Sequence, residues 1–101
     1  KIKNYVDNYY ADVNLNVGSV AEAMGLSSNY VSKLFKSVSN EGLLSYINHV
    51  RISHAKELLR TTSLTVDEIA PMAGFSNTRS FRRNFQNTEG ITASDYRNGN
   101  K

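Results

Sequence analysis

The sequence contains no cysteine and only one proline, Pro71, among its 101 residues. The absence of cysteine excludes a disulfide framework, a thiolate metal site and a cysteine nucleophile. No run of 18 apolar residues is present, so no membrane-spanning helix is expected. No basic and apolar signal segment opens the sequence, and we expect a cytoplasmic protein. The length suits one compact domain or two very small ones that share a core, and 40% hydrophobic residues without a low-complexity run indicate that the chain folds.

The residue patterns that catalysis needs are also missing. The serines have no nearby pattern of histidine and carboxylate partners, and there is no glycine-rich loop that could bind phosphate. His49 and His54 are five residues apart, which separates them by roughly 140° around a helix, so they cannot share a metal there. We therefore predict no enzymatic activity, no metal and no cofactor, and a surface position for both histidines.

Acidic residues are absent from two short basic segments. The net charge is only +3, and residues 1–50 carry four lysines against four acidic residues. Residues 51–101 carry eight Lys or Arg against five acidic residues, which accounts for the whole excess. Segments 28–36 and 77–88 contain two and three positive charges, respectively, and no negative charge. Such clustering favours a polyanionic partner, although a solvated charged face is the simpler alternative for a single segment.

The hydrophobic pattern is helical along the whole chain, without the alternation that is typical of strands. Polar residues suited to cap helix N-termini and glycines suited to end helices mark the boundaries. We therefore predict an all-α protein. The predicted helices start near Ile2 and then span 17–24, 29–38, 43–61, 65–73, 77–87 and 92–97.

Helical spacing also predicts which side chains are buried. In helix 29–38 these are Val31, Leu34, Phe35 and Val38. In helix 43–61 they are Leu44, Ile47, Arg51 (in part), Ala55, Leu58 and Leu59. The remaining aromatic residues that we assign to core packing are Tyr46, Phe75, Phe81, Phe85 and Tyr96.

The two basic segments belong to an internal repeat. "VAEAMGLS" (20–27) aligns with "IAPMAGFS" (69–76) at an offset of 49, and one inserted residue makes the offset 50 for the helix that follows. Val31 and Phe35 then coincide with Phe81 and Phe85, and the outward set Asn29, Ser32, Lys33 and Lys36 coincides with Arg79, Arg82, Arg83 and Gln86. Each copy is a short helix, a glycine turn and a second helix. The sequence therefore predicts two helix-turn-helix motifs joined by the long helix over 43–61.

Two matching polar faces need a common explanation. The second helix of a helix-turn-helix, here called the reading helix, enters the major groove of DNA and contacts base edges with long polar side chains. Arginine can contact guanine through two hydrogen bonds. The long helix would span roughly 28 Å at 1.5 Å per residue, which is close to the spacing of about 34 Å between successive major grooves. We therefore predict that one monomer contacts two adjacent major grooves.

These residues resemble the AraC/XylS family of bacterial transcription regulators. Within this family they look most like the C-terminal DNA-binding domains of two-component response regulators and related Firmicutes-type activators. The resemblance extends from about Asn4 to Arg97. It is carried by "NYVSKLFK" (29–36), "YINHVRISHAKELL" (46–59), "IAPMAGFSNTRSFRRNF" (69–85) and the closing "YR" (96–97). It implies a seven-helix DNA-binding domain over 1–101. Its parts are a first helix-turn-helix lobe over 1–42, a linker helix over 43–62 and a second lobe over 63–101.

The resemblance also implies roles for individual residues and partners. Base contacts are implied for Asn29, Ser32 and Lys33 in the first reading helix and for Thr78, Arg79 and Arg83 in the second, and phosphate contacts for Lys36 and Arg82. Double-stranded DNA is the implied ligand, with RNA polymerase as a further partner. Because the chain starts at Lys1 directly before an apolar stripe, we expect a preceding N-terminal regulatory or dimerisation domain.

Three residues depart from the family pattern. Asn40 replaces the usual glycine after the first reading helix, and asparagine tolerates the left-handed conformation that this turn requires. Pro71 removes a backbone hydrogen bond to the Asp67 carbonyl inside a helix, so we expect this helix to be kinked or shortened. Ala93 replaces the family's proline in the closing segment, without expected harm.

Two alternatives stay open at the level of the sequence. Arg51 faces the junction of the two motifs, where it could form an internal ion pair or contact a phosphate. For the whole chain, the rival hypothesis is a helical protein-interaction module whose basic faces bind an acidic partner. Salt dependence separates the two hypotheses, because affinity for DNA falls steeply with salt concentration.

Overall fold

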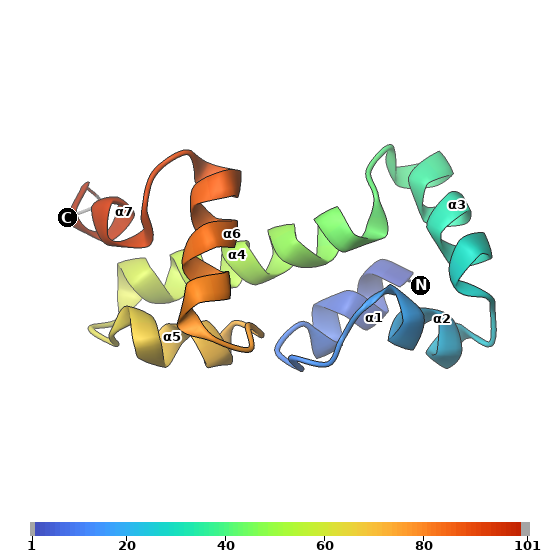
Figure 1. Ribbon diagram of the computed structural model, residues 1–101, viewed down its shortest axis with the longest axis horizontal. Coiled ribbons are helices and arrows are strands. Elements are labelled where there is room, and N and C mark those ends of the chain that lie inside the picture. Colours follow the sequence, from blue (N-terminus) through green and yellow to red (C-terminus); the bar gives the residue numbers. More distant parts are fainter. Residues whose placement is uncertain (1, 100–101) are drawn as a thin grey trace.

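The computed structural model describes residues 2–99, which form seven α-helices around two separate hydrophobic cores (Figure 1). The helices are α1 (Ile2–Tyr9), α2 (Val17–Met24), α3 (Ser28–Ser39), α4 (Leu43–Thr61), α5 (Val66–Met72), α6 (Thr78–Glu89) and α7 (Ala93–Gly99). The described residues contain no strand. None of the described helices combines the length and the apolar character needed to cross a membrane. The predicted all-α fold, with two helix-turn-helix motifs on a long linker helix, is confirmed.

Side-chain caps explain where the helices begin and end. Asn16 and Thr65 each form a capping box, in which the cap side chain and the third residue of the helix satisfy one another's backbone N–H groups. Ser27 and Asn77 cap the N-termini of α3 and α6. Asn40 ends α3 in the left-handed conformation with φ of 59°, so the prediction made for this asparagine is confirmed.

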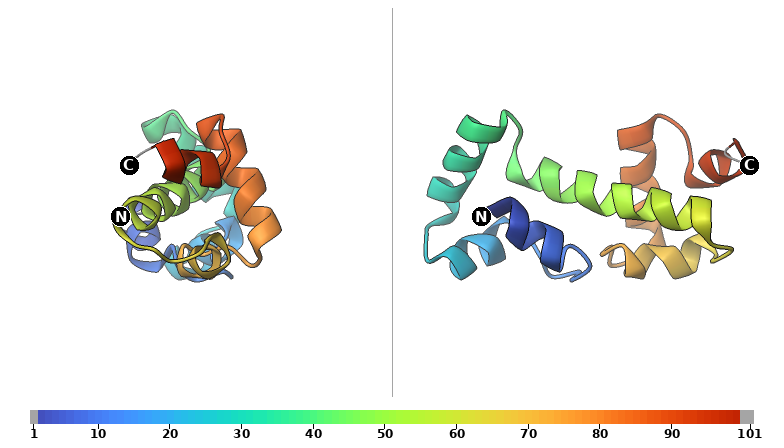
Figure 2. Two further views of the ribbon diagram at one scale, coloured as in Figure 1. Left: turned by 90° about the vertical axis from the view of Figure 1, so that its left-hand side faces the viewer. Right: turned by 180° about the vertical axis from the view of Figure 1, so that it is seen from behind.

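Both hydrophobic cores are built on α4. Leu43 and Ile47 pack in the first core with residues of α1, α2 and α3, whereas Ile52, Ala55 and Leu59 pack in the second with residues of α5, α6 and α7. The two lobes therefore lie one after the other along a single helix, and the molecule measures 42 × 22 × 21 Å. α3 and α6 both stand across α4 and rise in the same direction in Figure 1, an arrangement that the reverse view in Figure 2 repeats.

The repeat seen in the sequence is also a repeat in packing. Val31 and Phe35 at the back of α3 are buried, as are Phe81 and Phe85 at the back of α6. Phe35 and Phe85, at matching positions of the repeat, each pack against a tyrosine. The ring centroids are 5.3 Å apart for Phe35 and Tyr46, and 5.6 Å apart for Phe85 and Tyr96. The prediction that the aromatic residues form core packing is confirmed for Phe35, Tyr46, Phe75, Phe81, Phe85 and Tyr96, the two tyrosines being half-buried.

Three leucine and valine positions were predicted wrongly. Leu34, Val38 and Leu44 were expected in the core, but their exposed fractions are 38%, 76% and 57%. α3 packs through the narrow face that carries Val31 and Phe35, and Leu34 and Val38 instead line an open groove beside α1 and α2. Leu44 lies in a groove between α4 and α6. The core positions on α4 that we did not predict are Leu43 and Ile52.

Pro71 lies inside α5, which has only seven residues and ends at Met72. Three backbone hydrogen bonds follow at the end of this helix: Ala73 N–H donates to the Ile69 carbonyl at 3.0 Å, Gly74 N–H to the Pro71 carbonyl at 3.1 Å and Phe75 N–H to the Ala70 carbonyl at 3.0 Å. α5 is therefore short, as expected for a helix that contains proline, and the backbone hydrogen bonds of the turn that leads into α6 are still formed.

Candidate nucleic-acid interface

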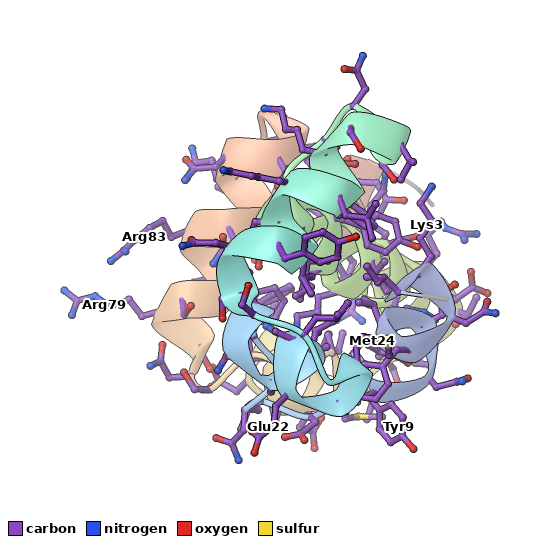
Figure 3. The ribbon with its side chains drawn as sticks, turned by 90° about the vertical axis from the view of Figure 1, so that its right-hand side faces the viewer. Lys3, Tyr9, Glu22, Met24, Arg79 and Arg83 are labelled. Carbon is purple, nitrogen blue, oxygen red and sulfur yellow. The ribbon has the colours of Figure 1, made fainter. Side chains whose placement is uncertain are left out.

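α6 exposes three arginines on the face that points away from its buried phenylalanines. Arg79, Arg82 and Arg83 are exposed, whereas Phe81 and Phe85 are fully buried. Arg79 and Arg83 are one turn apart, and both extend away from the body of the molecule to the same side (Figure 3). Within residues 2–99, none of the three guanidinium groups has a carboxylate within 4 Å. Their charges and donors are therefore available to a polyanion.

α3 presents a less charged version of the same face. Asn29, Lys33 and Lys36 are exposed, and Ser32 is half-buried between them. Neither lysine forms an ion pair with any described residue. In α3, the ammonium groups of Lys33 and Lys36 and the amide of Asn29 thus take the place of the guanidinium groups of α6. The two faces offer different hydrogen-bonding patterns to a ligand.

The first turn of each reading helix is fixed by its cap. The Ser27 hydroxyl and the Asn77 side-chain oxygen accept backbone N–H groups of the third residue in α3 and α6 at 3.1 and 2.7 Å. These turns carry Asn29 in α3, and Thr78 and Arg79 in α6. Thr78 is the first residue of α6 and is half-buried. The side chains predicted to contact DNA are thus brought together on each reading helix, with one set in each lobe.

Arg51 has hydrogen-bond partners that the sequence did not indicate. Its side chain is only 7% exposed, and its Nε donates to the Tyr10 carbonyl at 2.9 Å. Its Nη2 donates to the carbonyls of Asp12 and Leu15, at 2.9 and 3.2 Å. Both alternatives considered for this arginine are therefore wrong: it forms no ion pair with a described residue and is not accessible to a phosphate. An arginine inside the apolar stripe of a helix was the one hint in the sequence.

Burial lowers the pKa of Arg51, and the nearby charge of Asp12 raises it in part. Because an arginine guanidinium stays protonated near neutral pH, the side chain is a buried cation. Backbone carbonyl oxygens of one loop solvate it in place of a carboxylate.

The two histidines lie on the surface, as predicted. His49 Nδ1 contacts Glu41, whose carboxylate also accepts the Ser45 hydroxyl at 2.9 Å. Burial raises the pKa of Glu41, but the hydrogen bonds from Ser45 and His49 and the charge of His49 outweigh it, so this pKa lies below its ordinary value. The His54 ring stacks on Tyr10 with centroids 3.8 Å apart. Residues 2–99 contain no group of three or more His, Cys, Asp or Glu side chains that could hold a metal.

Comparison with known proteins places this geometry in a family. A family described as a helix-turn-helix domain matches residues 20–99. The HTH-type transcriptional regulator YijO of Escherichia coli K12 is 40% identical over 96 residues, which cover 95% of this chain and 34% of that protein. The arabinose operon regulatory protein of the same organism is 34% identical over 95 residues, which cover 94% of this chain and 32% of that protein. The chain thus spans about a third of the length of these relatives.

A solved structure of similar size has the same fold over nearly its whole length. The C-terminal domain of the two-component response regulator yesN from Fusobacterium nucleatum has a TM-score of 0.92 and 33% identity, with 95% of this chain and 93% of that chain covered. The family resemblance read from the sequence is confirmed. The chain belongs to the AraC-type helix-turn-helix family of DNA-binding domains of transcription regulators.

Proposed function

We propose that the domain binds a specific sequence of double-stranded DNA, with α3 and α6 in two adjacent major grooves. In this proposal Asn29, Ser32 and Lys33 of α3 and Thr78, Arg79 and Arg83 of α6 contact bases, and Lys36 and Arg82 contact phosphates. Arg79 and Arg83 lie on one side of the helix, whereas Arg82 is rotated about 80° from the midline of that pair, which favours a phosphate contact for Arg82.

The observation that carries the proposal is the matched pair of exposed cationic faces in two lobes of one fold. Each face is backed by a buried apolar pair, Val31 and Phe35 or Phe81 and Phe85, which holds the helix rigid. A solvated charged face needs neither this rigid support nor repetition at a fixed distance. α4 spans roughly 28 Å at 1.5 Å per residue, which suits two grooves about 34 Å apart once the width of the lobes is added.

The wider role of the protein is part of the same proposal. The domain serves as the DNA-binding part of a bacterial transcription activator that acts in the cytoplasm. It works with RNA polymerase and with an N-terminal regulatory or dimerisation domain. We propose no catalytic role, because the site is built from side chains that bind and orient a polyanion.

The test is a titration of fluorescent DNA duplexes at two salt concentrations. We expect preference for a duplex obtained by selection from random sequence over a scrambled duplex of equal length. With Lys36 and Arg82 on phosphates, the affinity for either duplex should fall roughly 10-fold between about 50 and 200 mM salt. Equal affinity for both duplexes would contradict sequence-specific binding. Weak binding without salt dependence would favour the protein-interaction hypothesis.

A further inference from the structure

The two lobes meet directly at one buried junction. The loop between α1 and α2 lies beside the turn between α5 and α6, as both views in Figures 1 and 2 show. Arg51 of α4 fills this junction: it donates three hydrogen bonds to carbonyls of the first-lobe loop. Its guanidinium also lies 6.0 Å from the ring centroid of Phe75, which belongs to the core of the second lobe. One side chain therefore contacts both lobes.

Gly74 closes the junction from the side of the second lobe. Its φ is +101°, a conformation that residues with a Cβ rarely adopt. A Cβ at this position would overlap the Tyr10 carbonyl oxygen and lie 2.7 Å from Arg51 Nε. Glycine is thus required for the second lobe to approach the carbonyl that Arg51 binds. Stacking of His54 of α4 on Tyr10 adds a third contact to the same loop.

Away from this junction the lobes face one another across an open polar groove. Ser45, Asn48 and His49 of α4 line it opposite Asn84 and Asn87 of α6. The cores themselves are separate: no residue is shared between the two buried clusters. The relative orientation of the lobes therefore depends on α4 and on the contacts around Arg51.

We propose that Arg51, with Gly74, acts as a positioning residue that fixes the angle and distance between the two reading helices, and so sets the spacing of the DNA sequence that the domain accepts. This inference rests on the proposed function, because spacing matters only if both helices enter grooves. Three hydrogen bonds from one planar guanidinium hold the first-lobe loop in a single orientation. Lysine cannot reproduce this fork, because its ammonium is a point donor on a flexible chain.

The experiment measures the affinity for duplexes in which the two contacted blocks are moved closer or further apart by one base pair. Each base pair shifts the second block by about 3.4 Å and rotates it by about 34–36°. We expect the unaltered domain to lose about tenfold or more in affinity, which corresponds to one lost bidentate base contact. Arg51→Lys should bind the original spacing more weakly, and its penalty for the altered spacing should shrink to about threefold or less because flexible lobes adapt to both.

Arg97→Lys is the matched control. Arg97 also donates to two backbone carbonyls, those of Leu59 and Thr62, but all three residues belong to the second lobe and its part of α4. The spacing penalty of this variant should equal that of the unaltered domain. His54→Ala, at an exposed position, removes a lesser contact of the same junction and should reduce the penalty in part. It also tests the proposal if Arg51→Lys fails to fold.

The outcomes separate this inference from the proposed function. If the unaltered domain shows no spacing preference, the two-groove function itself is wrong. If it shows one that neither Arg51→Lys nor His54→Ala changes, only the role of the junction is refuted.

A direct readout of lobe orientation is available because the chain lacks cysteine. Spin labels on Ser37→Cys of α3 and Gln86→Cys of α6, both exposed, report the distance between the lobes in the absence of DNA. The distance distribution should broaden with Arg51→Lys and stay narrow with Arg97→Lys. Equal distributions in the two variants would overturn the proposal.

Discussion

Replacing Phe85 by alanine tests the packing that supports the second reading helix. Phe85 is 0% exposed, and its ring lies 5.8 Å from Phe81 and 5.6 Å from Tyr96. Burial of such a side chain contributes about 1.5–3 kcal/mol to the free energy of unfolding, and each aromatic pair about 0.5–1.5 kcal/mol more. These terms agree with the loss of about 3–5 kcal/mol that is usual when a buried phenylalanine is truncated to alanine.

The loss is large compared with the whole stability of the domain. A chain of this size has a free energy of unfolding of about 5–15 kcal/mol. Urea unfolding followed by circular dichroism should therefore show a folded variant whose midpoint is lower by about 1 M or more. Leu44→Ala is the control, because this leucine was expected in the core but is 57% exposed. Its effect should stay within about 0.5 kcal/mol. A Phe85→Ala effect below about 1 kcal/mol, or an equal effect of the two changes, would refute the packing described above.

Arg83→Ala should cost roughly 1–3 kcal/mol of binding free energy on the selected duplex and relax the preference at one or two base pairs. Arg82→Ala should weaken binding to all sequences alike and reduce the slope of log affinity against log salt concentration by about 1. Equal losses for both variants on the selected and the scrambled duplex would show that the face is only an electrostatic patch. Thr65→Ala, which removes the capping box of α5, should lower the free energy of unfolding by about 0.5–2 kcal/mol in urea titrations. Because the pKa of Glu41 is below its ordinary value, its carboxylate stabilises the domain at neutral pH, and this contribution is lost as the pH falls below about 4.3 and through the folded pKa. Glu41→Gln should therefore flatten the pH dependence of the free energy of unfolding in this range. An unchanged pH dependence would contradict a stabilising role of the Glu41 carboxylate. The isolated domain should sediment as a monomer at micromolar concentration, and a stable dimer in analytical ultracentrifugation would contradict this.

Helix boundaries were predictable because they depend on local chemistry. Asn16, Thr65 and Thr92 each bond to backbone within three residues of themselves, and Asn40 adopts the left-handed conformation that its side chain tolerates. Such interactions can be read from a few neighbouring letters of sequence. The internal repeat then predicted the pairing of helices, because an element that recurs with the same apolar spacing packs in the same way.

Burial at the edges of the cores was not predictable from spacing. Periodicity identifies an apolar side of a helix but not how much of that side a neighbour covers. Leu34 and Val38 of α3 continue the apolar side, yet no described element covers them, whereas Leu43 lies in the core at the position directly before the exposed Leu44. The crossing angles of the helices decide these cases, and they are a property of the assembled fold.

The partners of Arg51 were hidden for a different reason. They are backbone carbonyls of a loop about 40 residues away, and a carbonyl leaves no signal in the sequence. In the sequence, Gly74 indicates only the turn of the second helix-turn-helix, because the close approach of Tyr10 involves a distant segment. The candidate base and phosphate contacts remain predictions. Their residues lie on the outward faces of α3 and α6, and binding experiments with DNA test each of them.

Base-by-base interference mapping on a selected duplex tests the central claim most directly. Removal of single bases, followed by separation of bound from free DNA, identifies every position that the domain needs. Two reading helices on one linker helix predict two short blocks on the same side of the duplex, with centres about 10–10.5 base pairs apart. Arg83→Ala should reduce sensitivity at one or two base pairs of one block and leave the other block unchanged. A single block, or uniform sensitivity along the duplex, would contradict the binding of two adjacent major grooves.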